Sequence, residues 1–127
     1  MLNNFFEDYG DYFYFIFRVL VGLLFAQHGA QKLFGWLGGN QAELFSLMGA
    51  AGIIEFFGGI LLALGLITQF IAALGAIEML VAYSIVHFPN SWIPIANKGE
   101  LALLYFAAFL VLLVHGSRKW GLDNAFS

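Results

Sequence analysis

No cysteine occurs among the 127 residues of the chain. Without thiols, the chain by itself offers no disulfide exchange, no cysteine-ligated iron–sulfur cluster and no thiol nucleophile. Any electron transfer would therefore need a bound cofactor or a partner protein.

Charged residues are scarce as well, at 10% of the chain, compared with about 25% in an average soluble domain. Only five residues are Lys or Arg, and they form no basic stripe that could follow a phosphate backbone, so we expect no nucleic-acid binding. In contrast, 61% of the residues are hydrophobic. This composition is that of a protein embedded in a lipid bilayer.

Four apolar stretches cover approximately residues 12–34, 45–67, 70–88 and 99–115. Crossing about 30 Å of hydrocarbon takes about 20 helical residues, so all four can cross, the last one only just. We therefore predict an all-α fold, a four-transmembrane-helix antiparallel bundle that forms one domain over residues 1–127. The first eleven residues are acidic and lack Lys and Arg, unlike a cleaved secretory signal, so we expect the first helix to be retained.

The connections between the stretches differ in length. Only about Thr68 and Gln69 separate the second stretch from the third, which predicts a tight hairpin, whereas the loops near residues 35–43 and 89–98 are longer and fall on the opposite side. Positive charges on the two sides are nearly balanced, with Arg118 and Lys119 on the side of the termini. We expect a prokaryotic inner-membrane protein with both termini in the cytoplasm.

Polar side chains gather in the half of the bilayer next to the long loops. Ionised groups in hydrocarbon cost roughly 2.5–3.5 kcal/mol each on insertion scales, so their presence needs a reason. Each of the four predicted helices contributes at least one polar residue at this depth, which predicts a shared intramembrane site. Its members are His28, Gln31 and Lys32 from the first helix, Glu55 from the second, His87 from the third and Glu100 from the fourth.

Spacing supports this convergence. His28 and Lys32 are four residues apart and share a helix face. Glu55 lies on a stripe with Gly52 and Gly59, where glycine allows helices to approach closely, so Glu55 is expected to point into the bundle. A buried carboxylate stays ionised only if paired, so acids that share one lysine would be able to exchange protons. A proton-coupled redox ligand requires such chemistry.

A deeper level holds Arg18 and Glu78, for which we expect an ion pair between the first and third helices, with a proton path or a contact with a partner as the alternatives. Glu78 and His87 are nine residues apart, about 900° of rotation, and so project from opposite faces of a straight helix. Either Glu78 faces a partner subunit, or the helix unwinds before Pro89.

Simpler structural roles compete with these functional ones. His28 alone could be a hydrogen-bonded contact between helices. Glu100 could simply stabilise the start of the fourth helix, where the helix dipole favours a carboxylate. The glycine stripe could serve packing alone.

Several motifs occur together and in order, and with them the chain resembles the DoxX family of small four-helix integral membrane proteins over roughly residues 14–123. The motifs are Arg18, GLLFAQHGAQKLFG at 22–35, GIIEFFGG at 52–59, LGLIT at 64–68, VH at 86–87 and KGELALLY at 98–105.

The resemblance implies a link to quinol-oxidising or thiosulfate:quinone oxidoreductase complexes, or to membrane-associated redox stress systems. Three positions depart from the family pattern. Gln69 stands where a basic residue is frequent, Lys98 where a second glycine is common, and Glu78 in a stretch that is usually apolar.

Residues and resemblance together favour an integral membrane subunit of a respiratory or redox complex that binds a quinone or quinol in the loop-side half, alongside other subunits or as a homo-oligomer. No electron carrier is recognisable in the chain alone, so we expect at most a quinone-linked oxidoreductase subunit. We predict no metal-ion site. The candidate catalytic residues are Glu55 and His87, and the candidate ligand-binding residues are His28, Gln31, Lys32 and Glu100.

In this hypothesis His28 and His87 hydrogen-bond the carbonyl oxygens of the ligand, and Lys32 supplies positive potential for a quinol anion. Glu55 exchanges protons, assisted by its polar neighbours. Three alternatives remain open. The first is an accessory subunit that docks a larger partner without chemistry of its own, and the second is a haem held by His28 and His87, which lie at similar depth. The third is transport of a small solute, for which four short helices offer little cavity without oligomerisation.

Overall fold

The computed structural model describes residues 2–126. Every regular element in this range is helical, which confirms the predicted all-α fold of apolar helices. The elements are α1 (Leu2–Phe34), α2 (Leu47–Leu64), α3 (Thr68–Ala82), a π-helix η1 (Tyr83–His87), a 3₁₀ turn η2 (Phe88–Asn90), the short α4 (Pro94–Asn97), α5 (Glu100–His115) and a second 3₁₀ segment η3 (Leu122–Phe126).

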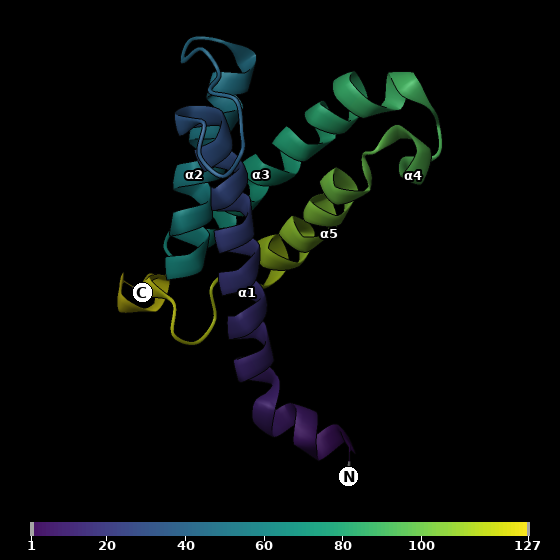
Figure 1. The fold of residues 1–127 in the computed structure, drawn as a ribbon. Coiled ribbons are helices and arrows are strands. Elements are labelled where there is room, and N and C mark those ends of the chain that lie inside the picture. The colour runs from purple at the N-terminus through teal and green to yellow at the C-terminus, as the bar shows by residue number, and fades with distance from the viewer. Residues whose placement is uncertain (1, 127) are drawn as a thin grey trace.

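The long helices form two antiparallel pairs. α1 packs along α2 and α3 packs along α5, and the two pairs meet near the α2–α3 turn and diverge toward the other end (Figure 1). Both long connections lie at the diverging end, as predicted, while the C-terminal segment returns to the end where the pairs meet. The molecule is therefore open on the side of the long loops.

Three helical segments within residues 2–126 are long and apolar enough to cross a membrane: α1, α2, and the continuous run Thr68–Asn90. The fourth, α5, has 16 residues and covers roughly 24 Å, somewhat less than the hydrocarbon thickness. α1 begins at Leu2, earlier than the predicted residue 12, and its first turns extend beyond the other helices (Figure 1).

Helix ends follow local capping chemistry. Ser46 begins α2, its hydroxyl accepting a hydrogen bond from the backbone N–H of Gly49. Gly65 ends α2 in the left-handed region at φ 70°, where its own N–H and that of Leu66 bond back to carbonyls of the last turn. The turn thus occupies residues 65–67, and α3 begins at Thr68, two residues earlier than predicted.

Glycine makes the α1–α2 contact possible. A Cβ atom on Gly22, Gly29 or Gly59 would collide with the backbone of the facing helix. The side chain of Phe109 likewise packs against Gly75 where α3 meets α5. The predicted role of the glycine stripe in close packing is confirmed, and it turns Glu55 toward α1.

Candidate functional site

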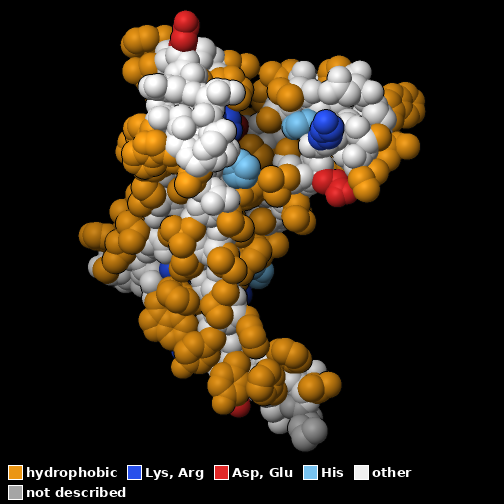
Figure 2. All heavy atoms as spheres, viewed as in Figure 1, with side chains coloured by type: hydrophobic (Ala, Val, Ile, Leu, Met, Phe, Trp, Pro, Cys, Tyr) orange, Lys and Arg blue, Asp and Glu red, His pale blue; other side chains and the backbone are white. Residues whose placement is uncertain are grey.

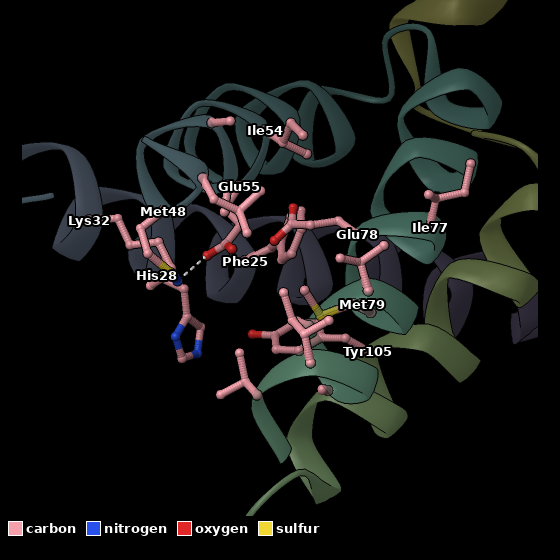
Figure 3. A pocket seen from close by; sticks show the side chains of 18 of the residues that line it. Phe25, His28, Lys32, Met48, Ile54, Glu55, Ile77, Glu78, Met79 and Tyr105 are labelled. Carbon is pink, nitrogen blue, oxygen red and sulfur yellow. Dashed lines mark hydrogen bonds and ion pairs between the residues drawn. The ribbon is translucent and has the colours of Figure 1, made fainter. Parts of the chain in front are cut away.

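A cavity of about 440 Å³ lies between the two helix pairs, in the half of the molecule next to the long loops. Most of its lining is apolar, and the few polar side chains come from every long helix (Figure 3). In the space-filling view, hydrophobic side chains cover most of the visible face, and histidine and cationic side chains gather at the hollow between the arms (Figure 2). The polar or ionisable residues of the lining are His28, Lys32, Glu55, Glu78, His87, Lys98 and Tyr105.

Lys32 and Glu55 form the ion pair that anchors one wall. Lys32 Nζ lies 2.7 Å from Glu55 Oε1, which joins α1 to α2 (Figure 3). Glu55 is only 3% exposed, so its charge is compensated by the lysine rather than by water. The predicted contact between these residues is confirmed.

The two histidines line the same cavity from different helix pairs. The ring of His28 lies edge-on to that of Tyr105, with ring centroids 5.8 Å apart. His87 Nδ1 lies 3.1 Å from the backbone carbonyl oxygen of Asn97. His28 is therefore placed by packing, and His87 by a hydrogen bond to the loop before α5.

Glu78 and His87 both line the cavity, although an uninterrupted α-helix would place them on opposite faces. The π-helix Tyr83–His87 accounts for this result. Each π-helical residue turns the chain by less than the roughly 100° of an α-helical residue, which brings His87 round toward the face of Glu78. Of the two possibilities left open by the sequence, the change in winding before Pro89 is the one observed.

Asn97 fixes the loop that carries this wall. It is 2% exposed, and its side-chain amide donates to Tyr83 Oη at 3.0 Å and to the carbonyl of Ser91 at 3.0 Å. Its side-chain oxygen accepts a 2.7 Å hydrogen bond from the N–H of Gly99. One buried side chain thus connects η1, the loop and the start of α5.

Glu78 and Tyr105 are members of the cavity lining that sequence reasoning did not place there. The Glu78 carboxyl group lies beside that of Glu55 (Figure 3), and its Oε1 is buried without a hydrogen-bond partner. Tyr105, on α5, is 7% exposed and its hydroxyl points into the cavity (Figure 3). An ionisable residue such as Glu78 is energetically costly in an apolar helix, and that cost was the sequence signal that could have placed it in the site. No chemical pattern in the sequence distinguished Tyr105 from the other aromatic residues.

The predicted ion pair between Arg18 and Glu78 is wrong. Arg18 is fully buried at the opposite end of the bundle, and its guanidinium donates to the backbone carbonyls of Leu62, at 3.0 Å, and Ser117, at 2.6 Å. Arg18 therefore satisfies the C-terminal end of α2 and the segment after α5, where unpaired carbonyls and the helix dipole favour a cation. The depth of Arg18 along its helix could not predict these partners, because Ser117 is 99 residues away in the sequence and reaches Arg18 only through the tertiary fold.

Gln31 and Glu100 lie outside the cavity lining, contrary to their predicted place in the site. Gln31 Nε2 donates to the carbonyl of Leu37 at 3.0 Å and so secures the loop after α1. Glu100 is exposed in the first turn of α5, where its carboxylate suits the helix dipole. Gln31 directly precedes Lys32, and consecutive residues of an α-helix point about 100° apart, so the Gln31 side chain lies on the outer side of α1.

Lys98 stands at the rim of the cavity in a left-handed conformation, φ 63°, as the residue that ends α4. A residue with a Cβ atom is disfavoured in this region, whereas glycine adopts it freely. The conformation gives a physical reason for the glycine expected at this position from the resemblance. In this chain Lys98 adopts the left-handed backbone conformation that suits glycine, and its side chain adds a positive charge at the rim of the cavity.

The cavity can hold an apolar body and a small polar head. The Lys32 ammonium group and the His28 imidazole line the cavity from α1, and the Glu78 carboxyl group and the His87 imidazole line it from α3 and η1. Among residues 2–126, no group of three or more His, Asp or Glu side chains has the arrangement needed to hold a metal ion.

Comparisons with known proteins identify the family of the chain. No solved structure matches the chain. An uncharacterized protein of Haemophilus influenzae is 40% identical over 132 residues, and the match covers 98% of both chains. The sequence profile of the DoxX family matches residues 13–88, which include α2, α3 and all but the first turns of α1. The chain therefore belongs to the DoxX family of membrane proteins.

Proposed function

We propose that this protein is an integral membrane subunit of a respiratory or redox complex and binds a quinone or quinol in the cavity between its helix pairs. The observation that carries the proposal is the Lys32–Glu55 pair, 2.7 Å apart and with a buried carboxylate, on the wall of a mostly apolar cavity of about 440 Å³. Apolar cavities with a few convergent polar groups are typical ligand sites.

The rim of the cavity suits a ligand that arrives through the bilayer. Met48, Ile77 and Val81 line the cavity and are also exposed on the outer surface of the helices. In a membrane these side chains face acyl chains, so an apolar tail can extend from the cavity into lipid without meeting water. A lipid-soluble ligand is favoured over a polar metabolite.

The polar groups suit a ring that carries two oxygen substituents. Lys32 and His28 can donate hydrogen bonds from α1, and Glu78 can accept one from α3, since its Oε1 has no partner among residues 2–126. A bound quinone would supply the electron-transfer chemistry that a chain without cysteine lacks. The protein's own residues would bind and orient the ring, exclude water, and hold protons at carboxyl and imidazole groups.

Equilibrium binding of a short-tailed quinone analogue to the purified chain in detergent or nanodiscs tests this function. We expect binding in the wild-type protein and its loss in His28→Ala and Glu55→Gln. Matched controls are His115→Ala, at the far end of α5, and Glu43→Gln, on the exposed loop, which should bind as the wild type does. No binding by the folded wild-type protein rejects the proposal.

The haem alternative has one supporting observation. Histidines that ligate metals usually donate their second ring N–H to a carbonyl or carboxylate, and His87 is so placed against Asn97. An absorption spectrum of the purified protein decides it: a Soret band lost in both His28→Ala and His87→Ala supports haem, and its absence from protein purified from haem-replete cells removes this candidate.

The accessory-subunit alternative depends on Glu78 and on the Phe-rich surfaces. Glu78 lines the cavity, which removes the first support, whereas phenylalanines such as Phe57 and Phe70 are exposed and available to a partner or to lipid. Co-purification from native membranes, read by mass spectrometry, identifies any partner under either reading.

A further inference from the structure

We propose that the cavity selects ligands whose head group donates hydrogen bonds, so that the reduced, dihydroxy form of an aromatic ring binds more tightly than its dicarbonyl form, with Glu78 and His87 as the two acceptors. This inference rests on the proposed function, because it specifies which chemical form of the ligand the same cavity takes. It also makes Glu78, rather than Glu55, the carboxyl group that contacts the ligand.

Glu78 is the acid that remains available. Glu55 is held by Lys32 at 2.7 Å, whereas Glu78 Oε1 is buried and has no hydrogen-bond partner. The neighbouring carboxyl group of Glu55 can share a proton with Glu78, which leaves one of the two acids neutral, but among residues 2–126 no group donates a hydrogen bond to Glu78 Oε1. A buried acceptor without a donor is costly, and a ligand hydroxyl directed at Glu78 removes that cost.

The ring of His87 is fixed as an acceptor on the same wall. Its Nδ1 lies 3.1 Å from the Asn97 carbonyl oxygen, and a carbonyl oxygen can only accept. The proton of a neutral imidazole must therefore reside on Nδ1, which leaves Nε2 as a lone-pair acceptor. This corrects the expectation that both histidines donate to ligand carbonyl oxygens.

Groups able to donate are concentrated on the facing wall. Lys32 retains ammonium protons beyond the one directed at Glu55, and His28, also on α1, has no hydrogen bond within residues 2–126 that fixes its ring nitrogens. Tyr105, between the walls on α5, can donate or accept. A ring with two hydroxyl groups can accept at the α1 wall and donate at the α3 and η1 wall, whereas a dicarbonyl ring meets only the first requirement.

Three probes with the same decyl tail test the inference on the full-length wild-type chain in nanodiscs under anaerobic conditions: a benzohydroquinone, its dimethyl ether and the corresponding benzoquinone. We expect the hydroquinone to bind at least about tenfold more tightly than either of the others, because only it provides the donors that Glu78 and His87 lack.

Variants then assign the acceptors. Glu78→Leu removes the acceptor and should reduce the preference for hydroquinone over its dimethyl ether, and His87→Leu should do the same, whereas Glu43→Leu on the exposed loop should leave the preference unchanged. A preference that persists undiminished in folded Glu78→Leu overturns the assignment of that acceptor.

The outcomes separate the two proposals. Equal affinity for all three probes overturns this inference while the proposed ligand site stands. No binding of any probe overturns both. The comparison of probes uses the wild-type protein, so it remains decisive even if a variant fails to fold.

Discussion

Arg18 in α1 donates a 3.0 Å hydrogen bond from its Nε to the carbonyl oxygen of Leu62, in the last turn of α2. Its Nη1 donates at 2.6 Å to the carbonyl of Ser117, so one guanidinium group joins three separate parts of the chain. On the same side, the carboxylate of Asp123 accepts from the N–H groups of Ile67 and Thr68 and caps the start of α3. At the end where the helix pairs meet, Arg18 and Asp123 thus bond to backbone groups rather than to each other.

Replacing Arg18 should therefore destabilise the whole fold. Arg18→Ala leaves several buried carbonyl groups without donors, and we expect it to lower the free energy of unfolding by about 3 kcal/mol or more. Arg18→Lys keeps the charge but loses the planar set of donors, so its free energy of unfolding should lie between those of the wild type and Arg18→Ala. Thermal unfolding in detergent measures both. Arg118→Ala is the matched control because Arg118 is exposed; equal midpoints for Arg18→Ala and Arg118→Ala would contradict the role of Arg18.

The Lys32–Glu55 pair should show strong energetic coupling. Lys32→Gln leaves a carboxylate at 3% exposure without its cation, so we expect a loss of about 3 kcal/mol in unfolding free energy, and Glu55→Gln should cost a similar amount. The double variant should cost less than the sum of the two, by at least about 1 kcal/mol. A double-mutant cycle in detergent measures this coupling, and strict additivity would show that the two side chains do not act as a pair.

Close approach of α1 and α2 predicts intolerance at Gly29. A Cβ atom there would collide with the backbone of Phe56, which cannot move aside as a side chain can. Gly29→Ala should destabilise the protein by about 1–3 kcal/mol. Gly10→Ala provides the control in the same helix, since nothing lies near its Cβ position, and it should be neutral or stabilising by up to about 1 kcal/mol. Similar unfolding midpoints for the two variants would refute tight packing at Gly29.

Asn97 should govern the order of the loop next to the cavity. Asn97→Ala removes the donors to Tyr83 and Ser91 and the acceptor for Gly99, so we expect a loss of about 2 kcal/mol. Hydrogen exchange should become faster in residues 88–99, with little change in α1 and α2. Asn90→Ala is the control, because Asn90 is exposed and bonds only within its own turn. Unchanged exchange in Asn97→Ala would show that other contacts hold the loop.

Much of the site follows from local sequence pattern. The four-residue spacing of His28 and Lys32 places them on one face of α1 whatever that helix packs against. The glycines around Glu55 mark the face along which α2 can approach another helix, so the carboxylate had to point inward. Both features depend only on helix geometry and side-chain size, and both can be read without coordinates.

Other members of the cavity depend on contacts between distant segments. Glu78 and His87 line the same cavity because the helix changes from α to π over Tyr83–His87. The hydrophobic periodicity of the sequence does not predict this change. Gln31 faces away because a single residue of displacement rotates its side chain out of the cavity.

Composition and periodicity determined that this chain is an all-helical membrane protein with costly polar groups at one level, because burial in lipid permits few charges and requires the backbone to bond within helices. Only the packing of the helices decided which of those groups meet. Arg18 bonds to carbonyls brought to it by α2 and the C-terminal segment, and Glu78 comes to lie beside Glu55, because the two helix pairs close at one end and diverge at the other.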